Sequence, residues 1–352
     1  GRVMRSYRIV EYGAPLELAE RETPGPRGSE VLVRVLACGV CHTDVHMRRG
    51  YHDLGEGKRL DLSELHSLPL TPGHEIAGEV AAMGPEATGV SVGDRRIVYP
   101  WIGCGSCGVC LSGRDNLCPT ARYLGTRVDG GYSDYVLVPH PRYLFDYTGI
   151  EEALACTYAC SGLTAYGALK KVAPLARNDV LVIIGAGGLG LMATRLAGAV
   201  VKADLAVADI DARKLEAARQ AGARHVINPN DEGAKERVVE ITNGGAWAVI
   251  DFVGAPASAG FGMDVLRKGG KLVVVGLYGG AISISLPLLP LRARSIVGSF
   301  VGTLPELQDL LALVTGGAVA PIPIETRSLE RADETVDDLK AGRIVGRAVL
   351  VP

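Results

Sequence analysis

The sequence predicts an α/β protein with two domains, one a doubly wound parallel sheet and the other rich in β-strands. Within residues 5–100, short apolar segments such as 30–40 and 76–84 are separated by Pro and Gly turns, as expected for β-strands. From about residue 155, strand-like and helix-like segments alternate, which is typical of a parallel sheet covered on both faces. The 352 residues, of which 47% are hydrophobic, are enough for a large core and favour two domains.

The second half of the chain contains a series of expected strands and helices. The strand-like segments are 179–185, 203–209, 247–254 and 271–277, and helix-like segments at 190–200 and 212–223 lie between the first three. After about residue 295 we expect two helices, at 304–317 and 330–342, and a closing strand at 346–352. A segment that continues from 271 to 288 is expected to be an apolar strand that ends the sheet and packs across a subunit interface.

Charge and hydropathy limit the partners and the location. Lys and Arg total 37 and Asp and Glu total 39, which gives a net charge of −2, and neither sign forms a long run. Nucleic acids and anionic membranes attract basic patches, so the expected partners are small molecules or other subunits. No apolar run is long enough to cross a bilayer, and arginines interrupt the N-terminal segment where a signal peptide would be apolar. We therefore expect a cytoplasmic protein.

Four of the eight cysteines, Cys104, Cys107, Cys110 and Cys118, lie in one short glycine-rich segment. In a long chain without a secretion signal, cysteines indicate metal binding or catalysis rather than disulfides. The spacing lets one loop surround a tetrahedral ion, which predicts a structural Zn²⁺ with a closed coordination shell. The main alternative is an iron–sulfur cluster, although the fourth cysteine of ferredoxin motifs follows the third more closely. Four unligated core cysteines are a weaker alternative.

A glycine motif follows the apolar strand at 179–185. Its spacing is G-x-G-x-x-G, and it comprises Gly185, Gly187, Gly188, Leu189 and Gly190. Glycines between a strand and a helix permit a tight turn and allow the backbone to approach a pyrophosphate at the helix N-terminus. This context predicts a dinucleotide-binding site.

Asp209 ends the next strand, nineteen residues after Gly190. A carboxylate at this position accepts hydrogen bonds from both ribose hydroxyls and repels a 2′-phosphate, which favours NAD over NADP. Arg213 and Lys214 follow closely and weaken that exclusion of phosphate.

Segments 38–46 and 72–80 contain a thiolate, an imidazole and a carboxylate, but neither segment is decisive alone. The pattern Gly73-His74-Glu75-x2-Gly78-x5-Gly84, the four-cysteine segment and the glycine motif occur in an order that resembles the zinc-containing alcohol dehydrogenases of the medium-chain dehydrogenase/reductase family. The resemblance covers nearly the whole chain. It implies a GroES-like catalytic domain at 1–155 and 296–352, and a Rossmann NAD-binding domain at 156–295.

The resemblance also implies a second, catalytic Zn²⁺ bound by Cys41, His74 and Cys160, so that each chain holds two Zn²⁺ ions. Cys160 is chosen over Cys156 because the family pattern Cys-x-Gly-x-Thr begins at Cys160. Two thiolates and a neutral imidazole neutralise Zn²⁺ and leave one position for an alcohol or water, as a catalytic site requires.

Further roles follow from the same resemblance. Glu75 is similar to a carboxylate that can replace water on the metal, and Asp44 to one that orients the imidazole of His74. Thr43 resembles a hydroxyl that passes the substrate proton through the cofactor ribose to His46 at the surface.

His42 and Arg347 match positions that contact the cofactor phosphates. The implied assembly is a homodimer or a homotetramer.

The implied activity is oxidation of an alcohol to an aldehyde or ketone with hydride transfer to NAD. The stretch at 47–72 is longer than expected for this family and borders the substrate side, so it forms either a lid or a solvated loop. A specialist for formaldehyde, polyols or aryl alcohols is an alternative, as is a non-catalytic NAD-binding protein that retains the fold.

Overall fold

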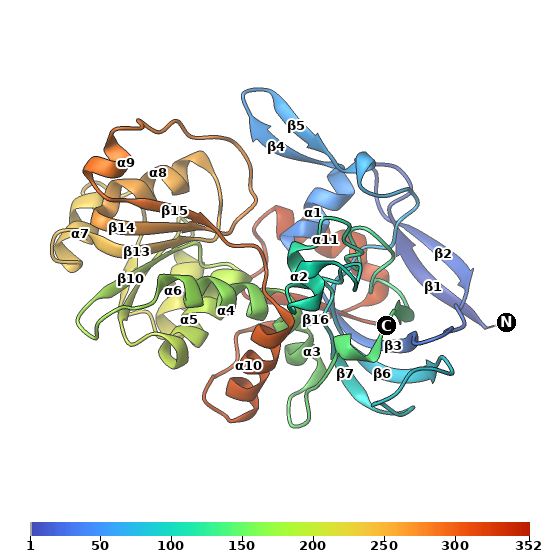
Figure 1. Cartoon of the computed structure of the whole chain (residues 1–352). Helices are drawn as coiled ribbons and strands as arrows, with labels where there is room; N and C mark the ends of the chain where they lie inside the picture. Colours follow the sequence, from blue (N-terminus) through green and yellow to red (C-terminus); the bar gives the residue numbers. More distant parts are fainter. Residues whose placement is uncertain (1) are drawn as a thin grey trace.

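The computed structural model describes residues 2–352 and places a parallel-sheet unit beside a β-rich unit (Figure 1). The parallel sheet has six strands in the order β12-β11-β10-β13-β14-β15. Their bounds are β10 Val180–Ile184, β11 Asp204–Ala208, β12 His225–Ile227, β13 Ala246–Asp251, β14 Leu266–Val274 and β15 Ser295–Gly298. The strand order reverses beside β10, so the predicted doubly wound α/β fold is confirmed.

Helices cover both faces of this sheet. They are α4 Ser161–Val172, α5 Gly188–Val200, α6 Ala212–Gln220, α7 Ala234–Ile241 and α8 Pro256–Val265, whereas the short helix α9 Leu288–Leu291 has no buried residue. Alternate residues of β10 show the two faces: Leu181 and Ile183 belong to one buried cluster, and Val182 and Ile184 belong to another. Strands buried on both faces explain why their sequences are almost continuously apolar.

The end of the sheet differs from the sequence expectation. The strand expected to continue from 271 to 288 ends at Val274, and residues 275–287 form no strand. The final strand is β15, which pairs in parallel with β14 and extends three residues beyond the predicted domain boundary at 295. The two glycines Gly279 and Gly280 adopt φ of 128° and 97°, a conformation in which a regular strand cannot continue.

The β-rich unit is built on a seven-stranded sheet in the order β16-β17-β3-β6-β7-β9, with β8 also paired to β3. Its strands are β3 Val31–Gly39, β6 Glu75–Met83, β7 Arg95–Val98, β8 Tyr135–Val138, β9 Leu144–Asp146, β16 Ile324–Ser328 and β17 Arg347–Val351. A separate ribbon is formed by β1 Val3–Arg8 and β2 Glu17–Glu22. Because β17 pairs antiparallel with β3, the C-terminal segment returns to the unit that holds the N-terminus.

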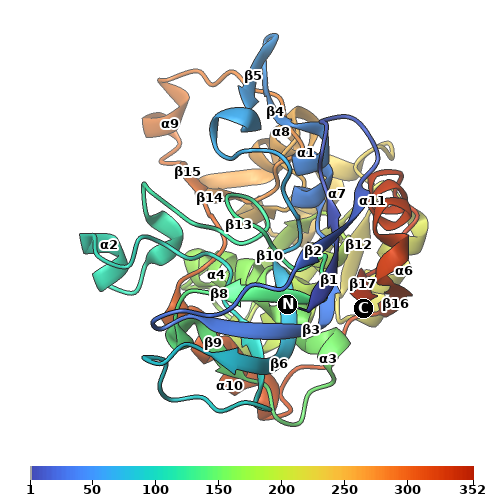
Figure 2. The ribbon, with the colours of Figure 1, turned by 90° about the vertical axis from the view of Figure 1, so that its right-hand side faces the viewer.

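Short helices and one hairpin complete this unit. The helices are α1 His42–Arg49, α2 Gly108–Leu111, α3 Glu152–Ala155, α10 Leu304–Thr315 and α11 Ala332–Lys340, with 3-10 turns η1 Leu62–Glu64, η2 Asp115–Leu117, η3 Pro141–Tyr143, η4 Cys156–Ala159 and η5 Leu329–Arg331. The long stretch at 47–72 contains the hairpin of β4 Tyr51–Gly55 and β5 Lys58–Asp61, which projects at the top of Figures 1 and 2. The stretch is therefore an ordered hairpin on the side of α1.

Candidate active site

Three potential metal ligands from distant parts of the chain meet between the two units. Cys41 immediately precedes α1, His74 immediately precedes β6, and Cys160 immediately precedes α4. Their ligand atoms all lie within 4.8 Å of one another, and the Sγ atoms of Cys41 and Cys160 are 3.9 Å apart. The structure thus brings together the three residues that the resemblance implied, while Cys156 lies in the core with its thiol 3.4 Å from the carbonyl of Ala153.

The N-terminus of α1 fixes the first of these ligands. Asp44 accepts a hydrogen bond from the backbone N–H of Cys41 at 3.0 Å, which caps the helix, and another from the hydroxyl of Tyr132 at 2.7 Å. The other oxygen of Asp44 lies 3.8 Å from Nδ1 of His74, longer than a hydrogen bond. Asp44 therefore faces the imidazole on the side expected for an orienting carboxylate.

The donor set fits a metal ion. His74 is completely buried, yet neither of its ring nitrogens has a hydrogen-bond partner among residues 2–352. Unpaired buried polar atoms are costly and require an explanation. A hydrogen bond with Cys160 holds the pKa of the Cys41 thiol well below its ordinary value, which favours the thiolate that binds metal. A Zn²⁺ ion bound to both sulfurs and to Nε2 of His74 would satisfy that nitrogen, while Nδ1 faces Asp44 at 3.8 Å.

Glu75 and Arg347 lie next to the three candidate metal ligands. One carboxylate oxygen of Glu75 accepts hydrogen bonds from the backbone N–H and hydroxyl of Ser161, at 2.8 and 3.0 Å, and the other forms an ion pair with Arg347. Both oxygens of Glu75, the residue expected to replace water on the metal, are thus engaged by Ser161 and Arg347. The stem of Arg347 packs against Gly188, where an added Cβ would lie 2.1 Å from its Cδ. Arg347, expected at the cofactor phosphates, therefore lies between Glu75 and the start of α5, beside the glycine motif.

The four-cysteine segment forms a second cluster. The Sγ atoms of Cys104, Cys107, Cys110 and Cys118 lie within 4.8 Å of one another. The backbone N–H groups of Cys107 and Ser106 donate to the sulfur of Cys104, at 3.3 and 3.5 Å, and lower the pKa of that thiol to about 5. The four sulfurs suit a closed tetrahedral site, because no other His, Asp or Glu of residues 2–352 joins the cluster.

The glycine motif occupies the turn between β10 and α5, at the carboxyl end of the sheet. Gly185 has φ of 101°, which a side chain would disfavour, and a Cβ on Gly190 would lie 1.7 Å from the carbonyl of Gly185. Gly187 precedes α5 and has open space around it, so a phosphate can approach its backbone. Each glycine therefore has a physical role in a phosphate-binding turn.

Asp209 follows β11 and stabilises this turn. Its carboxylate accepts hydrogen bonds from the backbone N–H groups of Ala186 and Asp211, both at 2.8 Å. Arg213 pairs with Asp211 at 2.9 Å and also donates to the carbonyl of Gly342. Arg213, which together with Lys214 was expected to weaken the exclusion of a 2′-phosphate, is thus paired with Asp211.

Helix α1 also carries the residues of the expected proton path. Thr43 and His46 are three positions apart, so they lie on neighbouring parts of one helix face. His42, expected at the cofactor phosphates, is exposed at the start of the same helix. The expectation that His46 lies at the surface is wrong: its side chain is only 7% exposed, because the ring of His52 on the hairpin packs against it.

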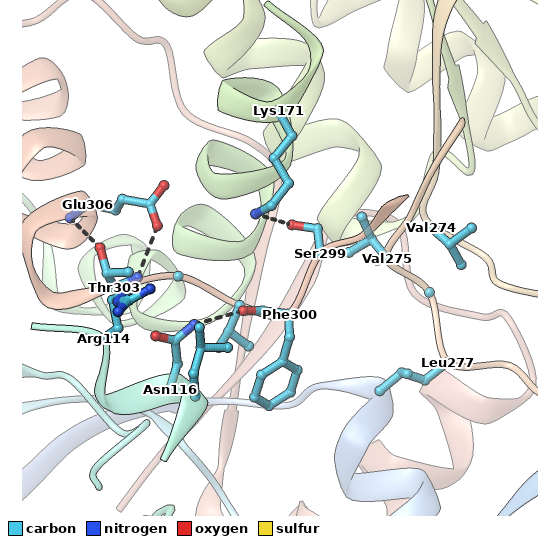
Figure 3. Close-up of a pocket in the computed structure, with 15 residues that line it drawn as sticks. Arg114, Asn116, Lys171, Val274, Val275, Leu277, Ser299, Phe300, Thr303 and Glu306 are labelled. Carbon is cyan, nitrogen blue, oxygen red and sulfur yellow. Dashed lines mark hydrogen bonds between the residues drawn. The ribbon is translucent and has the colours of Figure 1, made fainter. Parts of the chain in front are cut away.

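A cavity of about 680 Å³ opens at the carboxyl ends of β14 and β15 (Figure 3). Its wall includes Leu277 and Phe300, and Asn116 from the four-cysteine loop donates to the carbonyl of Phe300 at 3.0 Å. The Phe300 ring packs edge-on against Trp101, which in turn lies 4.9 Å from the ring of His74 between centroids. Neither Phe300 nor Asn116 was predicted, because Phe300 belongs to no motif and Asn116 is not one of the cysteines in the four-cysteine segment.

Comparisons with known proteins identify the family. Residues 27–147 match the alcohol dehydrogenase GroES-like domain, and residues 188–316 match the zinc-binding dehydrogenase domain. The chain is 42% and 40% identical to NAD-dependent alcohol dehydrogenases of Sulfurisphaera tokodaii and Saccharolobus solfataricus, in each case over 99% of this chain and 100% of the relative.

A solved structure supports the same assignment. The alcohol dehydrogenase of Aeropyrum pernix superimposes with a TM-score of 0.90 at 31% identity, covering 99% of this chain and 100% of the other. In residues 2–352 no helix is long and apolar enough to span a membrane. The chain belongs to the zinc-containing alcohol dehydrogenases of the medium-chain dehydrogenase/reductase family, with a GroES-like and a Rossmann domain.

Proposed function

We propose that the protein catalyses the reversible oxidation of an alcohol to an aldehyde or ketone, with hydride transfer to NAD. Its relatives at 37–42% identity over the whole chain are NAD-dependent alcohol dehydrogenases, which supports this reaction. The observation that carries the proposal is structural: Arg347 touches both Glu75, beside the metal ligand His74, and Gly188 in the dinucleotide turn. Metal and cofactor sites are thereby held next to each other.

The proposed metal ligands are Cys41, His74 and Cys160. Zn²⁺ bound there supplies a Lewis acid that lowers the pKa of an alcohol hydroxyl, and NAD accepts the hydride. Asp44 orients the imidazole through its position beside Nδ1. The cluster of Cys104, Cys107, Cys110 and Cys118 is proposed to hold a second, structural Zn²⁺.

The remaining residues bind the cofactor or conduct the proton. Residues 185–190 and His42 would hold the pyrophosphate, and Asp209 would bind the ribose hydroxyls. The neighbouring cation Arg213 is occupied by Asp211, which supports a preference for NAD over NADP. Thr43 and His46 would receive the hydroxyl proton along one face of α1.

Part of the cavity wall is apolar and can contact the carbon chain of an alcohol. Phe300, Val275 and Leu277 contribute to its wall, and the ring of Phe300 continues the aromatic contacts of Trp101 toward His74. The wall also contains polar side chains, among them Asn116, Ser299 and Thr303, which can form hydrogen bonds with hydroxyl groups. We propose primary and small secondary alcohols as the substrate class, with formaldehyde, polyols and aryl alcohols as the alternative.

The first experiment measures NADH formation by zinc-replete protein with NAD and a panel of ethanol, longer primary alcohols, benzyl alcohol, secondary alcohols and a polyol. Turnover that increases with the apolar surface of the alcohol is expected. Tight NAD binding without turnover of any panel member would favour the non-catalytic alternative. Preference for the polyol or for formaldehyde adducts would contradict the proposed substrate class.

We also propose a homo-oligomer assembled through the free edge of the parallel sheet. Within residues 2–352, strand β15 pairs only with β14, so its outer edge has unpaired backbone groups, and Ile296 on it is 36% exposed. Apolar side chains at least half exposed lie on the loop and helix that precede it; they are Leu277, Tyr278, Leu286 and Leu291. Such a patch is typical of a subunit interface.

Sedimentation tests the assembly. The wild-type chain is expected to sediment as a dimer or tetramer, and Ile296→Lys to shift it toward the monomer. The matched control is Val92→Lys, at a side chain 65% exposed in the β-rich unit. A monomeric wild-type protein, or equal effects of both substitutions, would contradict this interface.

A further inference from the structure

The hairpin β4–β5 carries a histidine that none of the sequence motifs includes. His52 on β4 packs against His46 of α1, with ring centroids 4.9 Å apart and planes tilted by 48°. His46 is 7% exposed, whereas His52 is half-buried. The two imidazoles therefore form a path from the enclosed face of α1 toward solvent.

The position of His52 is fixed by contacts on both sides of it. Arg49 donates to the carbonyl of Tyr51 from Nε and Nη2, at 3.2 and 2.8 Å. The guanidinium carbons of Arg49 and Arg59 also lie 4.2 and 3.9 Å, respectively, from the centroid of the Tyr51 ring. On the other side, the carbonyl of Asp53 accepts a hydrogen bond at 3.0 Å from the N–H of Gly280, in the parallel-sheet unit. Neither of these sets of contacts involves the imidazole of His52.

The surroundings of His46 do not allow it to retain a proton. Burial, the nearby His52 and the Arg49 cation lower the pKa of His46 to about 4. Nη2 of Arg49 lies 3.0 Å from Nδ1 of His46, and since a guanidinium can only donate, Nδ1 accepts and the imidazole is neutral. Near neutral pH, a proton that arrives at His46 must move on, and the imidazole in contact with His46 is that of His52.

We propose that His52 accepts the substrate proton from His46 and delivers it to solvent. This inference rests on the proposed alcohol oxidation, which supplies one proton from the hydroxyl for each hydride transferred. In the step, an N–H bond of protonated His46 breaks and an N–H bond of His52 forms, directly or through one water, and His52 then protonates water. No group is oxidised or reduced.

The charges around His52 suit a residue that releases a proton readily. Burial and the Arg49 cation lower the pKa of His52, so its imidazole is mainly neutral near pH 7 and free to accept. Arg59 stacks on the neighbouring Tyr51 ring, and across the hairpin it is the partner of Asp53 in the strand register. The opposite position to His52 is Leu60, which carries no charge.

Stopped-flow mixing of enzyme, NAD and an accepted alcohol in weak buffer tests the proposal. NADH absorbance reports hydride transfer, and a pH indicator reports proton release. In His52→Gln we expect proton release to slow about tenfold, a modest loss for a proton-transfer group because water can replace it partly. Added imidazole should restore the rate. His225→Gln, a half-buried histidine of β12, is the matched control and should behave as the wild type.

A second variant separates proton transfer from packing. His52→Phe keeps an aromatic ring against His46 but cannot bind a proton, so it should release protons as slowly as His52→Gln and also respond to imidazole. Wild-type release rates in both variants, or slow release that imidazole does not restore, would overturn the proposal. Unchanged NAD affinity and unfolding midpoint confirm that the variants are folded. A wild-type enzyme that forms no NADH would instead overturn the proposed alcohol oxidation.

Discussion

Arg347 and Glu75, which are 272 residues apart in the sequence, form an ion pair almost completely removed from water, with 4% and 0% of their side chains exposed. Glu75 adjoins His74 and holds Ser161 next to Cys160 by two hydrogen bonds. Through this pair, the residues that present the metal ligands are joined to the C-terminal strand β17.

We therefore expect that Glu75→Gln strongly destabilises the protein, because it leaves the Arg347 cation buried without a countercharge. Breaking one partner of a buried pair costs about 3–5 kcal/mol. Denaturant unfolding measures the change. The control Glu79→Gln breaks an exposed pair with Arg34 and should cost less than about 1 kcal/mol. Similar small losses in both variants would show that the buried pair contributes little.

Substitutions of Cys160 and Cys156, the two cysteines near the start of α4, should differ sharply in their effect on activity and zinc content. Cys160→Ser is expected to abolish turnover and to lower the zinc content by one ion per chain, because it removes a proposed ligand. Cys156→Ser should retain most of the activity and both ions, since its thiol lies in the core. Elemental analysis and the NADH assay measure both effects, and equal loss in the two variants would refute the assignment of Cys160.

Asp209 should control the choice of cofactor. Asp209→Asn removes the charge that repels a 2′-phosphate, so the ratio of kcat/KM for NAD to that for NADP should fall at least about tenfold, equivalent to about 1.4 kcal/mol. Asp204→Asn, at an exposed residue that begins β11 and pairs with Arg224, is the control and should leave the ratio unchanged. A ratio that is equal in Asp209→Asn and the wild type would exclude this role.

His46 should make stability depend on pH. Burial lowers its pKa from 6.5 to about 4, so the unfolded chain binds a proton more readily than the folded chain. The free energy of unfolding contributed by this group is thus fully present above pH 6.5 and is lost as the pH falls toward 4, on the order of 3 kcal/mol. His46→Gln should reduce this acid dependence in denaturant unfolding, whereas His225→Gln should do so much less. Parallel pH curves for His46→Gln and the wild type would contradict the buried, neutral imidazole.

Local sequence patterns were sufficient to predict much of the fold and several of the candidate site residues. The tight spacing of Cys104 to Cys118 brings the sulfurs together within one loop, and the glycines at 185–190 specify a turn between a strand and a helix. Such features depend on residues close in the chain, and the alternation of strands and helices predicted the parallel sheet for the same reason.

Only the tertiary structure decided how distant segments meet. The burial of His46 depends on the hairpin that places His52 over it, and the engagement of Glu75 depends on the return of β17 to β3. The cavity wall at Phe300 likewise depends on the contact between the four-cysteine loop and the segment after β15. Periodicity and spacing report on neighbours along the chain, whereas these contacts arise from packing between elements far apart in sequence.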